Sequence, residues 1–517
     1  MQVTEPKKRR KLLIFCIDGG VPAIVDRHDF FAVDRWVPGL RCTPVSALPT
    51  VFPSSTAPAH ASFLTGRHPQ GHGIVGNAFW SGEPVADIRS RSVNPFASVH
   101  PYERSALTAP SLLDWCEEEG LSAAAVQFPH TFSRSAGEAA IPSVYCLYAP
   151  GRSATVRLQG GTGTAELAYF DQMVRLTFSV CEGEPDQVLV SGGLHGTEVR
   201  FERGTARRLE VRLDEGGHLS IPLTILHLNA ERIDFTAATA VLSTPYGEAM
   251  AGLMDRADPD DGPSSLAPDY TANPHHDFHE SPRAPWVKDT ALAVLDEIDP
   301  DVLFVRFNQA DHAQEYLYWH AVRADVGLRE RAEEQILDAY RLIERQVGEI
   351  VRRCGDDADY VFFSDHGIDY VETHLRPNAV LDELGLGEEL TFRGDSNIAY
   401  LYSDRPLSQE EEQRLTRALA AADDTIEVVT AAVAERWQLP WGSARLGRLA
   451  ITCGPHREFQ YGPGSAREDV TSASHGYFPD APSMNGFFRA AGRLLPETAP
   501  PAHLVDVAGY VRNLYRG

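Results

Sequence analysis

The sequence predicts an α/β protein whose core is a doubly wound, mostly parallel sheet, interrupted by an inserted β-rich cap. Three stretches, KLLIFCIDGG, DVLFVRFNQAD and YVFFSDHG, each begin as a short apolar run and end in polar residues. This pattern is typical of buried parallel strands, which present side chains at their carboxyl ends. Amphipathic stretches separate the runs: from Arg329 to Val351 apolar residues recur near helical spacing. The alternation of buried strand and helix predicts the doubly wound sheet.

Residues from about 150 to 245 follow a different pattern. Runs such as QVLVSGG, RRLEVRL and LTILHL alternate apolar and polar residues between Gly-rich turns, which indicates antiparallel strands. We therefore expect these residues to form an inserted cap over the carboxyl ends of the core strands. The predicted parts are residues 1–150 as the first part of the α/β core, 151–285 as the β-rich cap and linker, and 286–517 as the second part of the core.

The segment 258–282 is polar and rich in Pro and Asp, so we interpret it as the linker that returns the chain to the core. It contains His275, His276 and His279, which are candidate metal ligands. A solvated loop is the favoured interpretation of this cluster.

Composition excludes several classes of function. The chain has 517 residues and a formal net charge of -25, which argues against a binder of nucleic-acid polymers, because phosphate backbones attract excess Lys and Arg. No apolar run approaches the roughly 20 residues that span a bilayer, so we expect no membrane association. Seven scattered cysteines without close pairs fit reduced thiols. We expect a cytoplasmic protein.

Four separate segments carry side chains of the metal-ligand type. They are Asp18; Asp311 with Glu315; Asp365 with His366; and His475. Carboxylate and imidazole ligands suit two divalent cations, and a hydroxyl aligned with such cations can lose its proton and attack phosphorus. Thr56, in STAPAHASFLTG, is the candidate hydroxyl. Each of these residues also has a purely structural alternative: the Asp-His-Gly run is a turn, Asp18 caps a helix, and Asn77 occupies a left-handed turn.

Taken together, the motifs resemble the alkaline phosphatase superfamily, in particular its branch of type I phosphodiesterases and nucleotide pyrophosphatases. The resemblance rests on IDG at a strand end, Thr56 nine residues before Thr65-Gly66, HPQGHGIVGN, SDHG and HGYFPDAPSM. It implies an alkaline-phosphatase-like core with Thr56 as nucleophile, and an Asn77 amide that holds a non-bridging phosphate oxygen. It also implies one metal ligated by Asp18, Thr56, Asp365 and His366, and a second ligated by Asp311, Glu315 and His475.

One position departs from the family pattern. The family usually has Asp-x-x-x-His where this chain has Asp311 and Glu315. Zn²⁺ is the expected cation, and Mn²⁺ or Mg²⁺ is an alternative because a second carboxylate favours harder ions. His312 or His320 is the alternative source of the nitrogen ligand, and tight binding of only one metal is a further alternative.

The reaction that this set of residues implies is in-line displacement at phosphorus, through a phosphothreonine intermediate that is then hydrolysed. A small-molecule phosphodiester or pyrophosphate is the expected substrate. The alternatives are a phosphomonoesterase or phosphonate hydrolase of the same superfamily, and a degenerate member that only binds its ligand. A sulfatase is disfavoured, because the resemblance implies that those enzymes need a cysteine or serine in place of Thr56.

Overall fold

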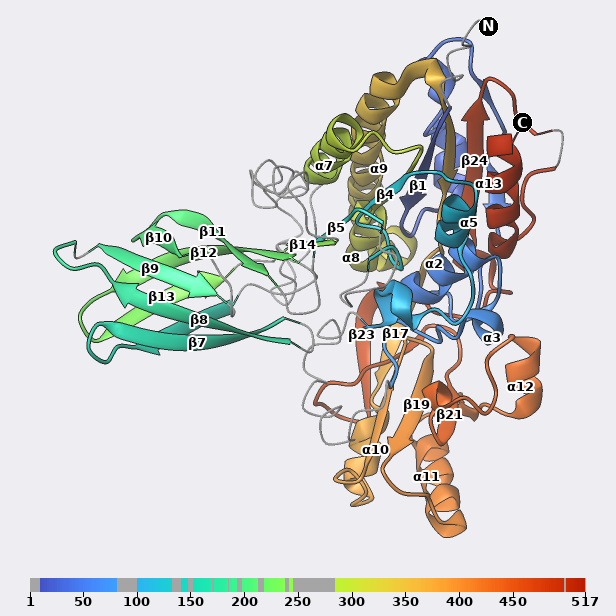
Figure 1. Ribbon diagram of the computed structural model, residues 1–517. Coiled ribbons are helices and arrows are strands. Elements are labelled where there is room, and N and C mark those ends of the chain that lie inside the picture. The colour runs from blue at the N-terminus through green and yellow to red at the C-terminus, as the bar shows by residue number, and fades with distance from the viewer. Residues whose placement is uncertain are drawn as a thin grey trace, which may run out of the picture. The chain divides into compact units, whose positions relative to one another are not determined.

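The computed structural model describes residues 10–80, 100–132, 141–146, 152–169, 172–184, 186–192, 198–212, 218–237, 241–244, 284–496 and 499–516 (Figure 1). Two compact units make up the chain. The core unit comprises Met1–Pro95, His100–Ala123 and Pro300–Gly517, and the second unit comprises Phe96–Val99 and Ala124–Asp299. The described part contains no helix that is both long and apolar enough to cross a membrane.

The core unit is a mixed α/β structure. Its described α-helices are α1 (Pro22–His28), α2 (Thr56–Thr65), α3 (Pro69–His72), α5 (Leu112–Glu118), α8 (Gln309–Arg323), α9 (Val326–Cys354), α10 (Pro377–Glu383), α11 (Gln409–Ala422), α12 (Ala431–Arg436) and α13 (Val507–Arg516). Its central sheet contains β1 (Lys11–Ile17), β2 (Arg41–Cys42), β3 (Ser46–Leu48), β15 (Val302–Phe307), β16 (Ala358–Phe363) and β24 (Gly486–Gly492).

Within this unit the central sheet runs in the order β2-β24-β16-β1-β15, and β3 pairs with β24. Strand β1 is parallel to both β15 and β16, whereas β24 is antiparallel to its neighbours. The register pairs Ile17 with Phe307 and Cys16 with Phe363, so all three parallel strands end at the same edge of the sheet. The predicted fold class is confirmed: a mostly parallel central sheet with additional antiparallel sheets.

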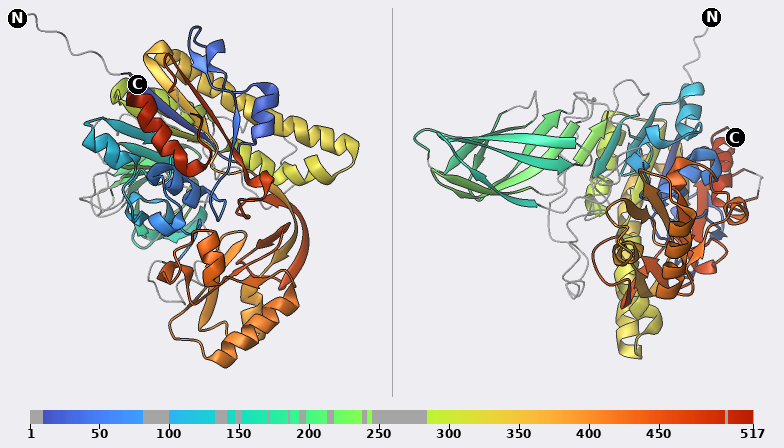
Figure 2. Two further views of the ribbon diagram at one scale, coloured as in Figure 1. Left: turned by 90° about the vertical axis from the view of Figure 1, so that its right-hand side faces the viewer. Right: turned by 90° about the horizontal axis from the view of Figure 1, so that it is seen from below.

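Both faces of the sheet are covered, which explains why its three parallel strands are apolar almost throughout. Successive residues of a strand point to opposite faces. Phe363 stacks on Phe63 of α2 with ring centroids 4.3 Å apart, whereas Phe362 stacks on Phe31 at 5.6 Å. Figures 1 and 2 show α2 and α13 on one side of the sheet and α9 on the other. The helix predicted over 329–351 is confirmed as part of α9.

Two smaller sheets complete the core unit. The first contains β17 (Asp369–Leu375), β22 (Arg457–Phe459) and β23 (Arg467–Ser474); the second contains β18 (Leu390–Gly394), β19 (Ile398–Ser403), β20 (Glu427–Val428) and β21 (Leu449–Thr452). Helices α10 and α11 contribute Leu381, Leu415 and Leu419 to the apolar core that the second of these sheets covers. The register of the three-stranded sheet pairs Asp369 with Ser474. His475 therefore follows a strand end that lies beside the chain just after His366.

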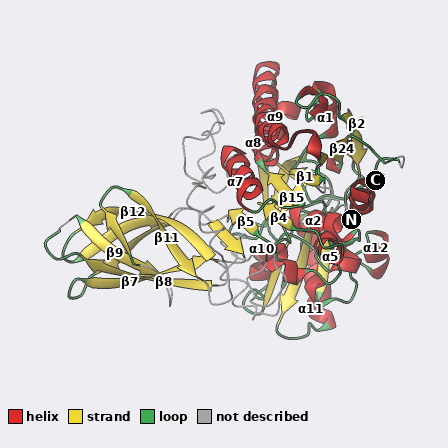
Figure 3. Ribbon diagram, turned by 45° about the horizontal axis from the view of Figure 1, so that its top comes forward, coloured by secondary structure: helices red, strands yellow, loops and turns green. Residues whose placement is uncertain are grey.

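The second unit consists mainly of antiparallel strands, as the alternating pattern predicts. The elements between residues 123 and 299 are β4 (Ala123–Val126), β5 (Ser143–Cys146), β6 (Arg152–Arg157), β7 (Thr162–Tyr169), β8 (Gln172–Val180), β9 (Gln187–Gly192), β10 (Val199–Glu202), β11 (Ala206–Arg212), β12 (His218–Leu228), β13 (Arg232–Ala237), β14 (Val241–Thr244) and α7 (Ala284–Glu297). Strands β7 to β10 form one sheet and β11 to β13 with β6 belong to another. Figure 3 labels β7, β8 and β9 of the first sheet and β11 and β12 of the second. Phe178 of the first and Phe235 of the second are buried with ring centroids 5.0 Å apart, so the two sheets share a core. The predicted return linker, with His275, His276 and His279, lies outside the described residues.

Candidate active site

The carboxyl edge of the central sheet brings together three of the predicted segments. Asp18 directly follows β1, and Asp365 and His366 follow β16 after a single residue. Asp311 was predicted at the end of a strand, and this placement is wrong, because β15 ends at Phe307 and α8 begins at Gln309. Asp311 therefore lies in the first turn of a helix, where the positive end of the helix dipole favours a carboxylate.

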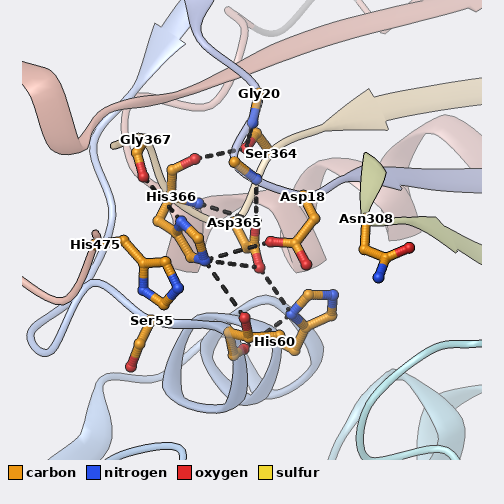
Figure 4. Close-up of polar contacts among 12 residues, drawn as sticks. Asp18, Gly20, Ser55, His60, Asn308, Ser364, Asp365, His366, Gly367 and His475 are labelled. Atoms are coloured by element: carbon orange, nitrogen blue, oxygen red, sulfur yellow. Dashed lines mark hydrogen bonds and ion pairs between the residues drawn. The ribbon is translucent and has the colours of Figure 1, made fainter. Parts of the chain in front are cut away.

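The first group of potential ligands surrounds one nitrogen of His366 (Figure 4). Its Nε2 lies 3.3 Å from Asp18 Oδ1 and 3.5 Å from Asp365 Oδ2. The other ring nitrogen, Nδ1, lies 2.9 Å from the Gly367 carbonyl oxygen, which can only accept, so Nδ1 carries the hydrogen. In the neutral ring the lone pair is then on Nε2 and faces both carboxylates, as a metal ligand requires.

The second group is formed by Asp311, His366 and His475, whose ligand atoms lie within 4.8 Å of one another. The rings of His366 and His475 are stacked with centroids 3.9 Å apart. Glu315 lies one helical turn after Asp311, and its Oε1 is 3.9 Å from His475 Nε2. The structure thus brings the sequence-predicted residues of the second metal position together.

Glu315 and His312 are the two candidates for the ligand position at which this chain departs from the family pattern, and their surroundings differ. Asp311, His312 and Glu315 also form a group within 4.8 Å, so both candidates are near the same carboxylate. His312 Nε2 lies 3.5 Å from the side-chain amide nitrogen of Asn308, whereas Glu315 also approaches His475. His320 belongs to no such group among the residues that the structure describes. The geometry favours Glu315.

The charges of the site fit divalent cations. Asp18, Asp311 and Asp365 are almost completely buried, and uncompensated buried carboxylates are costly. Within the described ranges, Asp18 Oδ1, Asp311 Oδ1 and His475 Nδ1 are buried without a hydrogen-bond partner. Burial, together with the carboxylates of Asp18 and Asp365, raises the pKa of Asp311 well above its usual value. Burial and the neighbouring His366 lower the pKa of His475, which keeps its imidazole neutral. Carboxylate and imidazole donors of this kind fit Zn²⁺ or Mn²⁺.

Thr56 is the first residue of α2, and its side chain reaches the first group of ligands. Thr56 Oγ1 lies 3.4 Å from His366 Nε2, and the residue is 5 % exposed. The N-terminus of a helix carries partial positive charge, which favours an anion beside it. The hydroxyl is therefore placed where an alkoxide and a phosphate would both be stabilised.

Asn77 lies beside the same helix end, although it is far along the chain. Its Oδ1 accepts a hydrogen bond of 2.8 Å from the backbone N–H of Ala57. This contact fixes the orientation of the amide, because the oxygen must face the N–H and the Nδ2 group is then turned away from it. Helices α2 and α3 occupy the intervening sequence.

Two further buried residues support the site and were not predicted. His60 Nδ1 lies 2.9 Å from the Thr56 carbonyl oxygen and 3.3 Å from Asp365 Oδ2. Arg306 donates from Nε, at 2.8 Å, and from Nη2 to Asp18 Oδ2. Each had a sequence signal: His60 is one helical turn after Thr56, and Arg306 is a charge inside an apolar strand, which needs a partner.

Comparison with protein families gives one match over most of the chain. The model of the type I phosphodiesterase / nucleotide pyrophosphatase family matches residues 12–190 and 216–478. All of the predicted site residues lie within these two ranges. No curated protein matches the chain.

Solved structures with a similar fold include murine ectonucleotide pyrophosphatase / phosphodiesterase 5, in an inactive form in complex with AMP. It has a TM-score of 0.52 and 11 % identity, over 98 % of this chain and 95 % of that chain. The human protein of the same name has a TM-score of 0.52 and 12 % identity, with the same coverage. Phosphonoacetate hydrolase from Sinorhizobium meliloti has a TM-score of 0.49 and 15 % identity, over 98 % of this chain and 96 % of that one.

Proposed function

Because the chain belongs to the type I phosphodiesterase / nucleotide pyrophosphatase family, whose members are metal-dependent phosphohydrolases, we propose that it cleaves small phosphodiesters or pyrophosphates with Thr56 as nucleophile. The observation that carries the proposal is the position of Thr56 Oγ1. It lies at a helix N-terminus, 3.4 Å from His366 Nε2, which in turn faces Asp18 and Asp365. A hydroxyl among potential metal ligands is the arrangement that nucleophilic attack on phosphorus needs.

The residues of the chain would divide the work as follows. Thr56 Oγ1 passes its proton to water and attacks phosphorus. The bond between phosphorus and the leaving oxygen breaks, the leaving alcohol or phosphate takes a proton from water, and the remaining phosphoryl ester stays on Thr56. Water then cleaves this ester and regenerates the hydroxyl. Asn77 Nδ2 donates to a non-bridging oxygen of the phosphoryl group, whose negative charge is also stabilised by the N-terminus of α2.

Metal ions would be held by two sets of side chains. Asp18, Asp365 and His366 would hold the first, and Asp311, Glu315 and His475 the second. When bound, the cations supply positive charge that favours the Thr56 alkoxide and the charge on the phosphoryl oxygens. Zn²⁺ is the proposed ion, and Mn²⁺ is the alternative because Glu315 stands where a histidine is usual.

A substrate panel with controlled metal content tests this proposal. The chelated protein receives Zn²⁺, Mn²⁺ or Mg²⁺ and is assayed with bis(p-nitrophenyl) phosphate, a dinucleoside pyrophosphate, p-nitrophenyl phosphate and a phosphonate. We expect turnover of the diester or pyrophosphate that depends on added metal. Thr65→Ala is the matched control for Thr56→Ala, since Thr65 lies at the other end of the same helix and its hydroxyl donates to the Ala61 carbonyl at 2.7 Å.

The other outcomes of the panel identify the alternatives. Faster turnover of the monoester or the phosphonate would make the chain a phosphomonoesterase or phosphonate hydrolase instead. Metal uptake and substrate binding without any turnover would indicate a degenerate, ligand-binding member. Wild-type-like turnover by Thr56→Ala would remove Thr56 from the mechanism.

A further inference from the structure

Asp395 is a buried carboxylate that reaches the candidate active site from a different sheet. It lies in the turn between β18 and β19, and it is 5 % exposed. Its Oδ2 accepts from the Ser55 hydroxyl at 2.5 Å and from the Asn77 backbone N–H at 2.9 Å. Its Oδ1 accepts from the Ser396 backbone N–H at 2.9 Å, which fixes the carboxylate in its own turn. One oxygen therefore joins the residue before Thr56 to Asn77.

This arrangement changes how the N-terminus of α2 is capped. Ser55 is the N-cap residue, and a serine there usually accepts a hydrogen bond from the first turn of its helix. Here the Ser55 side chain makes no such bond, because its hydroxyl donates to Asp395. The Ala57 N–H is instead satisfied by Asn77 Oδ1 at 2.8 Å. Because Asp395 binds the Ser55 hydroxyl, the Ala57 N–H is available to the Asn77 side chain. Asp395 also accepts a hydrogen bond from the backbone N–H of Asn77.

Two glycines lie against this carboxylate, and at Gly76 a side chain would crowd it. A Cβ atom on Gly76, which precedes Asn77, would lie 3.2 Å from Asp395 Oδ2. A Cβ atom on Gly476, which follows His475, would lie 3.4 Å from Asp395 Oδ1, and Gly476 also has a φ of +95° that favours glycine. Asp395 is therefore packed against segments that carry Thr56, Asn77 and His475.

We propose that Asp395 is a positioning residue that fixes the Thr56 hydroxyl relative to the Asn77 amide. The inference rests on the proposed function, in which these two groups act on the same phosphoryl group. Neither would be held as firmly by local structure alone, because Thr56 starts a helix and Asn77 lies in a turn. A misplacement of about 1 Å in a reacting group costs on the order of 10²-fold in rate.

Four variants test this role. Asp395→Ala removes the bonds to Ser55, Asn77 and Ser396. Asp395→Asn keeps one oxygen that can accept from both Ser55 and Asn77 but loses the acceptor for the Ser396 N–H, and Ser55→Ala removes only one bond. Asp423→Ala is the matched control: Asp423 is also a buried carboxylate beside the four-stranded sheet, but it binds Thr425, Arg457 and Arg467. For each variant we would measure kcat and KM with bis(p-nitrophenyl) phosphate, metal content and the unfolding temperature.

We expect Asp395→Ala to lower kcat by about 10²-fold with little change in KM or metal content. The kcat of Asp395→Asn should be about 10-fold higher than that of Asp395→Ala, and the kcat of Ser55→Ala should be about 10-fold lower than that of the wild type. Asp423→Ala should keep the wild-type kcat. A kcat for Asp395→Ala within about threefold of that of Asp423→Ala would overturn the inference. So would a loss of metal that parallels the loss of activity, or an Asp395→Asn variant no better than Asp395→Ala.

If Asp395→Ala does not fold, Asp395→Asn and Ser55→Ala decide, and wild-type kcat in both would overturn the role of Asp395.

Two outcomes separate the inference from the proposed function. If the wild-type protein turns over none of the phosphate esters, the proposed function fails. If the wild type is active and depends on Thr56, but the Asp395 and Ser55 variants are unaffected, only the inference fails.

Discussion

Asn77 makes two kinds of contribution to the site, and a pair of substitutions separates them. Its Oδ1 caps α2 at Ala57, and its Nδ2 group is the proposed donor to the phosphoryl group. Asn77→Ala removes both, whereas Asn77→Asp keeps an oxygen that can accept from Ala57 but removes the donor.

We predict that Asn77→Ala lowers kcat by about 10²-fold, the scale for one lost donor to a developing oxyanion, and loses about 1 kcal/mol of stability with the cap. Asn77→Asp should lose a similar factor in kcat while its unfolding temperature stays near that of the wild type. Steady-state kinetics and thermal unfolding check both. An unchanged kcat in Asn77→Asp would leave Asn77 as a capping residue only.

The choice between Glu315 and His312 as metal ligand leads to a second prediction. Glu315 lies on the same face of α8 as Asp311 and is 3.9 Å from His475, so Glu315→Ala should weaken metal binding by about 10-fold or more. Glu315→His should shift the metal preference further toward Zn²⁺, because a nitrogen ligand replaces a carboxylate. Metal content and competition titrations measure these effects. His312→Ala is the control, and a loss of metal in this variant alone would assign His312 instead.

Helix α2 carries Thr56 at one end, and its other end is near a pair of histidines that leads to a prediction about stability and pH. The rings of His68, just before α3, and His503 have centroids 5.0 Å apart. Burial and the neighbouring His503 lower the pKa of His68 to about 4, and burial lowers the pKa of His503. His503 Nδ1 also accepts from the Val505 N–H, which needs an unprotonated nitrogen.

We predict that this pair destabilises the protein as the pH falls from about 6.5 to about 4. In this range the unfolded chain binds a proton at His68 that the folded chain does not bind, so the free energy of unfolding falls with falling pH. His68→Gln should reduce this dependence, as urea unfolding at several pH values would reveal. His28→Gln, at an exposed histidine, is the control. Equal pH dependence in all three proteins would contradict the prediction.

Local sequence predicted the elements that carry a strong pattern. The strands that precede Asp18 and Asp365 are mostly apolar, with Lys11 and Asp359 near their starts, and their parallel alignment then brings both carboxylates to one edge. The boundary at Asp311 was misplaced although FNQAD contains Asn308, a residue type that is common at helix N-termini and is the N-cap of α8; its side chain makes no capping hydrogen bond there. Such a boundary depends on how the chain packs rather than on local preference.

The contacts of Asp395 could not be predicted in the same way. Its hydrogen bond to Ser55 joins residues 340 positions apart, and the sequence around it, RGDSNIAY, reads as an ordinary turn. Only the packing of a second sheet against the helix N-terminus brings the two together. The residues that bear chemistry were therefore easier to predict than the residues that hold them in place.

The whole chain combines a family core with a β-rich second unit, whose contribution to substrate choice is a further prediction. The compact second unit includes Ala124–Asp299, whereas the sequence pattern indicated 151–285. Within it, Arg152 of β6 pairs directly with Ala237 of β13. A short Gly-Ser linker between these neighbouring ends can therefore replace the strands between them.

We predict that this deletion changes the ratio of kcat/KM between diester and pyrophosphate substrates by about 10-fold or more, because insertions and loops commonly determine specificity. Metal content and the unfolding transition of the core unit should be retained. A linker of the same composition inserted in the turn at Gly183 is the control, since this exposed turn joins β8 and β9. Unchanged ratios in the deletion variant would remove the second unit from substrate selection.

The central claim is that Thr56 forms a covalent bond to phosphorus. The most direct measurement is acid quenching of the metal-loaded protein during turnover of bis(p-nitrophenyl) phosphate, followed by mass spectrometry of its peptides. We predict a nitrophenyl phosphoryl group on the peptide that contains Thr56, in the wild type and in Thr65→Ala but not in Thr56→Ala. A label on another residue, or release of nitrophenol by Thr56→Ala at the wild-type rate, would contradict the account.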